Sequence, residues 1–187
     1  KKYLSQRKCG EKRASYRQHS MELLYSLSVV VQWAPFIFYT VLWHYPQSWV
    51  DLCQSFETPP DPSKLMGDVA HVIKALQLLG LASVAVWSVP PWYSFVLFAA
   101  GQYLNFKVYQ LIGADGVYYG VRFGKSIPWV TEFPYGAMRD PQYIGCMLTS
   151  VAISSNVPIH HVLALLSGYV YMMWIESTER TPRVKVE

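Results

Sequence analysis

The feature that most constrains this chain is a repetition of apolar segments that are long enough to cross a lipid bilayer. Three of them cover residues 23–43, 69–87 and 92–112. Each is close to the roughly 20 apolar residues that a helix needs to span about 30 Å of hydrocarbon. Two shorter apolar segments, 144–157 and 162–175, follow and are separated by a proline. We therefore expect an all-α integral membrane protein with three transmembrane helices and a C-terminal helical hairpin, which makes four to five membrane helices.

Composition agrees with a membrane location. Hydrophobic residues make up 52% of the 187 residues and charged residues only 15%, whereas soluble domains average roughly 25% charged residues. Many of the seven Trp and fourteen Tyr residues lie near the ends of the apolar segments, as in the aromatic belts of membrane interfaces. The alternative is a soluble all-helical protein with a large core, and the length of the apolar segments argues against it.

The first 20 residues differ in charge from the rest of the chain. They hold seven Lys or Arg residues against Glu11 alone, so the formal net charge of +4 falls to −2 when the +6 of this segment is removed. We expect residues 1–20 to be a basic, disordered tail and residues 21–187 to form the membrane domain, which opens at Met21. Contact of the tail with anionic lipid headgroups is the alternative.

Charged residues outside the apolar segments bear on orientation. Residues 51–68 are polar and rich in proline, and we expect them to form a loop. Arg122, Lys125 and Arg139 lie between the third apolar segment and the hairpin, and further basic residues follow the hairpin. A hairpin that enters and leaves from one side brings these groups together, and the positive-inside rule then orients this polar region, where chemistry at a membrane surface would be placed, toward the cytosol. The basic tail, if it is counted, argues for the opposite orientation.

The longest part of the body that cannot lie in hydrocarbon is the polar, glycine-rich stretch 113–145. Within it, the recurring glycines of Gly116–Lys125 indicate either a packing face of small residues or an anion-binding loop. Asp140 and Pro141 predict the N-cap and the first turn of a helix. With Arg139 beside it, this helix start suits an anion such as a lipid phosphate. A capped helix with a surface arginine is the plainer interpretation.

Two other places suit a ligand. Ala99, Ala100 and Gly101 are small residues at which the backbone can approach a ligand or another helix. Glu176 closes the last apolar segment, and Glu179 follows one turn later. A carboxylate there could attract a sulfonium cation or bind a ribose hydroxyl, or it could simply end a helix at the interface. The three cysteines show no paired spacing, so we expect no metal site, and we expect no nucleic-acid partner.

Four segments together resemble a known family of membrane enzymes. They are Gly116–Lys125 (GVYYGVRFGK), Ile127–Tyr135 (IPWVTEFPY), Arg139–Gly145 (RDPQYIG) and Tyr171–Glu176 (YMMWIE). The resemblance is to the phospholipid N-methyltransferases, most closely to their plant-type branch, and it runs from about Leu24 to Glu179. RDPQYIG also resembles the RHPxYxG element of the wider isoprenylcysteine methyltransferase-like superfamily.

The resemblance implies a multi-pass enzyme of the endoplasmic reticulum membrane that uses S-adenosyl-L-methionine as methyl donor. It would methylate two phospholipids of the bilayer, phosphatidyl-N-methylethanolamine and phosphatidyl-N,N-dimethylethanolamine, to phosphatidylcholine. The same resemblance implies a set of cofactor-binding residues: Ala99, Ala100, Gly101, Tyr143, Gly145, Glu176 and Ser177. Of the family's two-glycine element the chain keeps only Gly101, and of its pair of glutamates only Glu176.

Methyl transfer from a sulfonium to an amine depends on proximity and orientation more than on a strong nucleophilic residue. Our hypothesis makes Glu176 and Arg139 the catalytic residues. Glu176 orients the cofactor, while Arg139, with Arg122 or Lys125, binds the lipid phosphate. The amine proton passes to a carboxylate or to water. A methyltransferase acting on the carboxylate of prenylated cysteine and a non-catalytic membrane adaptor with this fold remain as alternatives, and formation of a homo-oligomer is left open.

Overall fold

The computed structural model describes residues 18–178, and every regular element in that range is helical. The described residues are helical from residue 18 onward, and this helix continues through the 3-10 turn η1 (Val31–Trp33) into α2 (Ala34–His44). The further elements are α3 (Pro46–Gln54), α4 (Pro62–Val84), α5 (Trp92–Val117), η2 (Gly120–Phe123), α6 (Pro141–Ala152), η3 (Ile153–Ser155) and α7 (Ile159–Ser177). Of the expected tail, residues 1–17 lie outside the described range, and residues 18–20 are helical.

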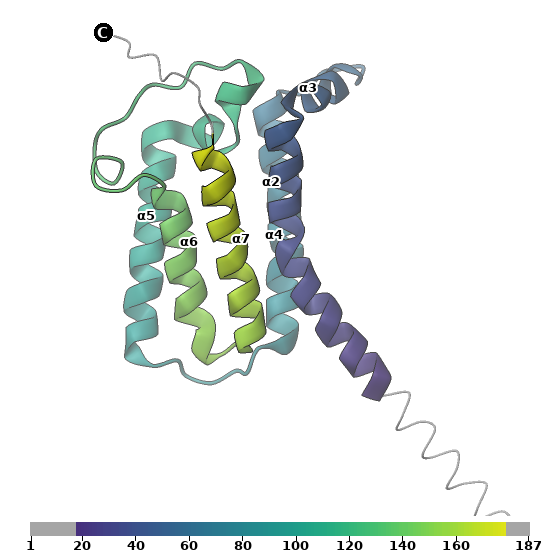
Figure 1. Ribbon diagram of the computed structural model, residues 1–187, viewed down its shortest axis with the longest axis vertical. Coiled ribbons are helices and arrows are strands. Elements are labelled where there is room, and N and C mark those ends of the chain that lie inside the picture. The colour runs from purple at the N-terminus through teal and green to yellow at the C-terminus, as the bar shows by residue number, and fades with distance from the viewer. Residues whose placement is uncertain (1–17, 179–187) are drawn as a thin grey trace, which may run out of the picture.

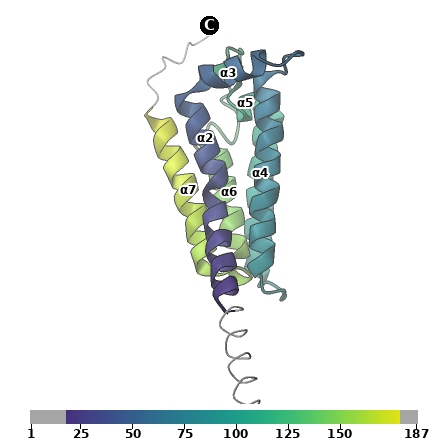
Figure 2. The same cartoon turned by 90° about the vertical axis from the view of Figure 1, so that its right-hand side faces the viewer.

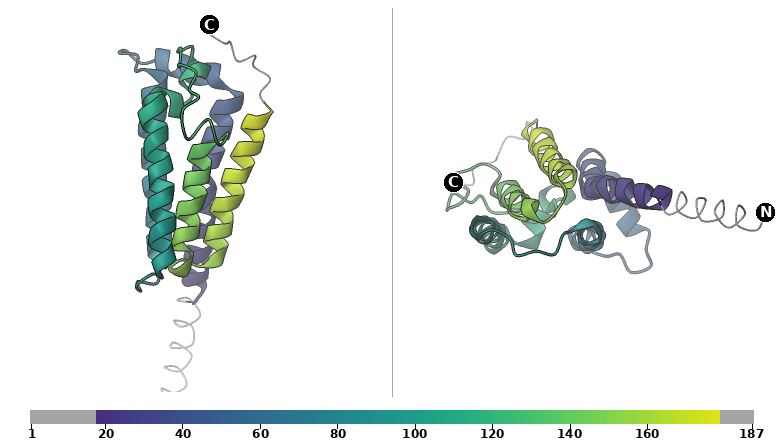
Figure 3. Two further views of the ribbon diagram at one scale, coloured as in Figure 1. Left: turned by 90° about the vertical axis from the view of Figure 1, so that its left-hand side faces the viewer. Right: turned by 90° about the horizontal axis from the view of Figure 1, so that it is seen from below.

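The long helices form a bundle whose members run alongside one another (Figure 1). The short helix α3 lies across one end of the bundle (Figure 2). The same end, which we call the α3 end, carries the segment 118–140 and the last turn of α7. The opposite end carries the connections 85–91 and 153–158 (Figure 3). Polar groups from distant parts of the sequence therefore meet at the α3 end.

Two of the helices are long and apolar enough to cross a membrane, Gln18–His44 and Pro62–Val84. Only 28% of the apolar window of each is buried inside the protein, whereas the core helix of a soluble protein would be mostly buried. Large apolar side chains such as Leu78 and Leu79 point outward, with exposed fractions of 64% and 66%. An extended apolar outer surface indicates contact with a membrane or a partner. The described residues agree with the predicted all-α membrane protein.

The first helix contains the irregularity that a proline produces. Pro35 has no N–H to donate to the carbonyl of Val31, four residues earlier, and its ring crowds that carbonyl. The chain forms the 3-10 turn η1 at this place, and α2 restarts with Pro35 in its first turn. The helix therefore continues past the proline with a local change of pitch.

The predicted loop 51–68 is wrong at both of its ends. Residues up to Gln54 belong to α3, and α4 begins at Pro62, well before the predicted span. The cause is a strong helix start, because the Asp61 side chain accepts a hydrogen bond of 3.0 Å from the Lys64 N–H and Pro62 occupies the first turn. Composition indicated a loop because proline and aspartate are common in turns, whereas here they begin a helix.

The helix α5 continues past Ile112, where the sequence predicted its end. Gly113 interrupts it with φ 66° and ψ −177°, a conformation that glycine adopts without a steric penalty. One further turn brings the chain against α4, where Tyr118 is only 2% exposed and packs with Met66 and Ala70. This packing fixes the start of the segment 118–140 at the α3 end.

The helices α6 and α7 form an antiparallel pair, as the proline between the two apolar segments predicts. The chain descends from the α3 end in α6, turns through η3 and returns in α7 (Figure 1). Pro158 stands at the N-cap position of α7. The start of α6 and the end of α7 both lie at the α3 end, and both contribute to the site described below.

Candidate active site

The carboxylate of Glu176 is the centre of a polar group at the α3 end. Glu176 lies in the last turn of α7 and is half-buried. Its Oε1 atom accepts hydrogen bonds from the phenol of Tyr119, at 2.9 Å, and from the phenol of Tyr143. Within residues 18–178, the hydrogen bonds to this carboxylate thus come from neutral hydroxyls. A carboxylate that is held in this way keeps its negative charge available to a cation.

The two tyrosines reach Glu176 from different elements. Tyr143 lies in the first turn of α6, whereas Tyr119 stands between α5 and η2 in the left-handed conformation, with φ 54° and ψ 28°. Such a conformation is uncommon for a residue with a side chain, and strained residues of this kind cluster at functional sites. The rings of Tyr39 and Trp43, with centroids 6.1 Å and 5.5 Å from that of Tyr119, hold it in place.

These groups line an outer cleft of about 300 Å³. Arg139 lies at its wall and donates from Nη2 to the backbone carbonyl of Glu176, at 3.3 Å. Arg122 lies on the other side, where its guanidinium stacks 3.3 Å above the ring of Trp43 and donates to the Trp43 carbonyl at 2.9 Å. Tyr135 also lines the cleft, and burial raises the pKa of its phenol to about 12. It therefore stays neutral, and a donor, at physiological pH.

The helix α6 begins at Pro141, as predicted, but Asp140 does not cap it. Its side chain makes no hydrogen bond to the N–H groups of the first turn. The carboxylate instead lies 3.6 Å from Nε of Arg139. Asp140 thus occupies the predicted N-cap position of α6, with φ −123° and ψ 66°, but its carboxylate faces the arginine and not the first turn. Asp140 is thus a wall residue of the outer cleft.

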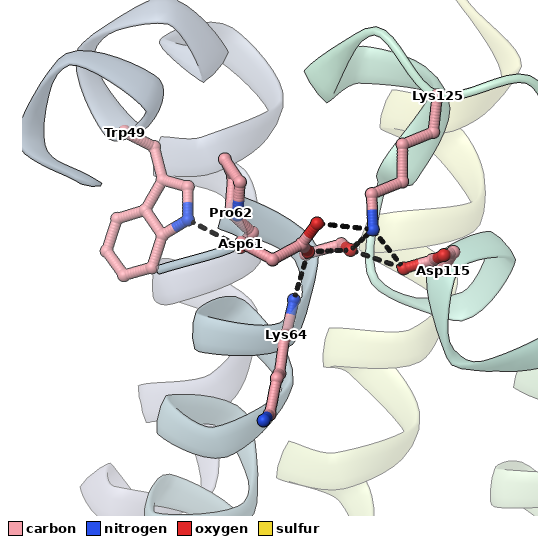
Figure 4. A network of polar contacts seen from close by, with 7 residues as sticks. Trp49, Asp61, Pro62, Lys64, Asp115 and Lys125 are labelled. Carbon is pink, nitrogen blue, oxygen red and sulfur yellow. Dashed lines mark hydrogen bonds and ion pairs between the residues drawn. The ribbon is translucent and has the colours of Figure 1, made fainter. Parts of the chain in front are cut away.

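The structure separates Lys125 from this cleft. Its ammonium lies 2.7 Å from Asp61 and 2.6 Å from Asp115 (Figure 4), and it donates to the Ser63 hydroxyl at 2.8 Å. Hydrogen bonding to Lys125 lowers the pKa of both carboxylates, and the two carboxylates raise the pKa of the lysine. Figure 4 shows that this network joins the start of α4 to the segment after α5. We call it the Lys125 network.

Several residues that the resemblance assigned to the cofactor lie outside the cleft. Ala99 and Ala100 are exposed on α5, and Ser177 is exposed at the end of α7. Gly101 packs against α6, since a Cβ built on it would lie 2.5 Å from the carbonyl of Gly145. The two glycines let α5 and α6 approach closely, which was the alternative reading of the small residues. Glu179 lies outside the described residues.

Four predicted site residues do come together along the outer cleft: Arg122, Arg139, Tyr143 and Glu176. Sequence reasoning missed Tyr119, although it belongs to the GVYYG segment. A glycine on each side of a tyrosine pair is the signal that could have indicated an unusual backbone there. Within the described part of the chain, no group of three or more His, Cys, Asp or Glu residues could hold a metal ion.

Comparisons with known proteins give a family match and a close relative. The family model described as phospholipid methyltransferase matches residues 90–185. The chain is 53% identical over 160 residues to the phosphatidyl-N-methylethanolamine N-methyltransferase of Arabidopsis thaliana, and these residues cover 85% of this chain and 94% of that protein. No solved structure matches the chain. The family match includes Tyr119, Tyr143 and Glu176.

Proposed function

The chain belongs to the phospholipid methyltransferase family, and on that premise we propose that it methylates phosphatidyl-N-methylethanolamine and phosphatidyl-N,N-dimethylethanolamine to phosphatidylcholine. The name of the Arabidopsis relative supports this choice of substrates. The structural observation that supports a methyl-transfer site is the carboxylate of Glu176, which two neutral phenols hold at the wall of a cleft.

We propose S-adenosyl-L-methionine as the methyl donor. When bound, it supplies a methyl group on a positively charged sulfur atom. The residues of the outer cleft suit it, because the negative charge of Glu176 is not paired with a lysine or arginine within residues 18–178. A cleft of about 300 Å³ also falls within the roughly 300–1,000 Å³ of small-molecule sites. We assign Glu176, Tyr143 and Arg139 to donor binding.

We propose separate tasks for the two oxygen atoms of the carboxylate. Hydrogen bonds from Tyr119 and Tyr143 to Oε1 fix the plane of the group, and no side chain of the described residues donates to Oε2. Oε2 is therefore the atom that orients a cation or a hydroxyl. The substrate amine must lose a proton before it can attack, and Glu176, Asp140 or a water molecule in the cleft accepts that proton.

We further propose that the bundle lies in the endoplasmic reticulum membrane with the α3 end in the cytosol. The first helix, α4 and residues 92–112 of α5 would span the bilayer, while α6 and α7 enter and leave from the α3 end. The basic residues of the segments that connect the helices support this orientation. The segment 118–140 holds three Arg or Lys residues, whereas the connections 85–91 and 153–158 hold none.

The test is an assay of the full chain in detergent micelles with a radiolabelled methyl donor. We expect label in phosphatidylcholine when either methylated phosphatidylethanolamine is supplied, and none in a farnesylcysteine analogue. A separate assay with unmethylated phosphatidylethanolamine shows whether the enzyme also carries out the first methylation. Calorimetric titration with the donor is the companion measurement. Methylation of the farnesylcysteine analogue alone, or the absence of donor binding, would overturn the proposal.

A further inference from the structure

A lysine lies inside the bundle, halfway along a helix that is apolar enough to cross the membrane. Lys74 belongs to α4 and is half-buried. Its ammonium lies 5.9 Å from the ring centroid of Tyr39 and 5.8 Å from that of Tyr118. No carboxylate among residues 18–178 forms an ion pair with it. Ionisable residues within membrane helices are costly, and they mark functional sites.

Lys74 lines an inner cavity that adjoins the outer cleft. The cavity has a volume of about 40 Å³, with Cys146 and Tyr169 also in its wall. This is several times the roughly 10–15 Å³ that one buried water needs, so a small polar group can enter. Tyr119 and Tyr143 line both the inner cavity and the outer cleft. The two tyrosines that hold Glu176 thus form the partition between the two spaces together with Val117 and Gln142.

The other basic groups near the site are already engaged by the protein. Lys125 is bound by two carboxylates, Arg139 lies beside Asp140 and bonds the end of α7, and Arg122 is stacked on a tryptophan. Lys74 differs from them, since its contacts within residues 18–178 are the faces of two aromatic rings. Such faces attract a cation without neutralising its charge. Lys74 therefore retains its attraction for an anion.

The depth of Lys74 suits a phospholipid headgroup. The apolar part of α4 begins near Val69, and Lys74 lies about 8 Å further along the helix axis at the usual rise per residue. Lysine side chains in helices point back toward the N-terminus and extend to the polar boundary. The ammonium is thus closer to the polar boundary than the backbone of Lys74 is.

We propose that Lys74 binds the phosphate of the phospholipid substrate in the inner cavity, with the lipid amine directed at the partition of Tyr119 and Tyr143. This inference rests on the proposed function. It replaces the predicted phosphate ligand, which was Arg139 with Arg122 or Lys125, and it has the lipid amine meet the methyl donor between the two tyrosines. Two carbon atoms separate the phosphate oxygen from the amine of the substrate, so a phosphate held by Lys74 keeps the amine near the cavity wall that Tyr119 and Tyr143 form.

The test compares the full chain with Lys74→Met in detergent micelles. The first measurement is equilibrium binding of phosphatidic acid, which has the phosphate but no amine. We expect at least a tenfold loss of affinity in the variant, with a similar rise in KM for phosphatidyl-N-methylethanolamine and no change in calorimetric donor affinity. Lys74→Arg keeps the charge and should retain most of the binding. Lys107→Met on α5, which is bonded to Gln110 and lines neither space, is the matched control.

Two outcomes would contradict the proposal. Unchanged binding of phosphatidic acid by Lys74→Met would show that the ammonium does not hold the phosphate. Loss of donor affinity alone would assign Lys74 to the donor carboxylate instead. If Lys74→Met fails to fold, Lys74→Gln provides the same comparison. Should the wild-type chain methylate no lipid, the proposed function fails, but binding of phosphatidic acid still tests Lys74 independently.

Discussion

The α3 end of the bundle holds two polar groups that differ in how their charges are paired. In the Lys125 network, one ammonium lies between Asp61 and Asp115 and each charge has a partner of the opposite sign. Around Glu176, the carboxylate is bonded only by neutral phenols within the described residues. The first group satisfies its own charges and links α4 to the end of α5. The second leaves a charge for a ligand.

The difference in charge pairing is our reason to treat the Lys125 network as structural and to propose the group around Glu176 as the binding site. Charged side chains in a sequence look alike, and both Lys125 and Glu176 were reasonable candidates for the site. An ion pair that is complete within the protein has little left to offer a substrate, because binding would first have to break it. We therefore expect variants of the Lys125 network to change stability and variants around Glu176 to change activity.

The largest effect should come from Glu176→Gln. Glutamine keeps the size and the oxygen that accepts from the two phenols, but it removes the negative charge. We expect kcat/KM for methyl transfer to fall on the order of 100-fold, as for other groups that stabilise charge in a site, and the melting temperature to change little. The matched control is Glu132→Gln, an exposed residue of the segment 118–140. Equal loss of activity in both variants would contradict the assignment.

A smaller loss should follow from removing either phenol. In Tyr119→Phe or Tyr143→Phe the ring stays and only one hydrogen bond to Glu176 is lost, so we expect about a tenfold decrease in kcat/KM, in line with hydrogen bonds to charged groups. The double variant should lose less than the product of the single losses, because both phenols act on one carboxylate. Steady-state kinetics of the three variants measure this coupling. Strict additivity would mean that the tyrosines act independently of Glu176.

Lys125→Met should affect stability more than activity. The variant leaves two carboxylates without their cation, but Asp61 and Asp115 are 42% and 48% exposed, so screening by solvent limits the expected loss to about 1 kcal/mol. The free energy of unfolding, from denaturant titration in micelles, measures it, and KM for the lipid should change less than threefold. A large rise in this KM at unchanged stability would restore Lys125 as a phosphate ligand.

The smallest effect should appear at acidic pH. The Lys125 network lowers the pKa of Asp61 and Asp115 in the folded protein, so both carboxylates stabilise the fold at pH values above about 4, their ordinary pKa. This contribution is lost as the pH falls through the lowered values. We expect the stability of the wild type to decrease more steeply below pH 4 than that of Asp61→Asn. Parallel pH profiles would mean that the network contributes nothing to stability.

Two Asp-Pro junctions illustrate what could be predicted from the sequence. The pair Asp140-Pro141 correctly predicted where a helix begins, because proline suits a first turn wherever it occurs. The side chain before it behaves differently at the two junctions: Asp61 caps α4, whereas Asp140 turns to Arg139. Whether an aspartate caps the helix or pairs with an arginine depends on the residues that the fold places next to it. A local sequence pattern does not contain these neighbours.

The sequence by itself determined the helical class, the approximate positions of the long helices, and Glu176, Arg139 and Tyr143 as candidates, since apolar length and family-like segments are local properties. Only the tertiary structure decided which charges are paired. It joined Lys125 to carboxylates from two other segments and brought Tyr119 to Glu176 across 57 residues. It also turned Lys74 toward an internal cavity. Such long-range contacts arise from packing of whole helices, which is why no local motif predicts them.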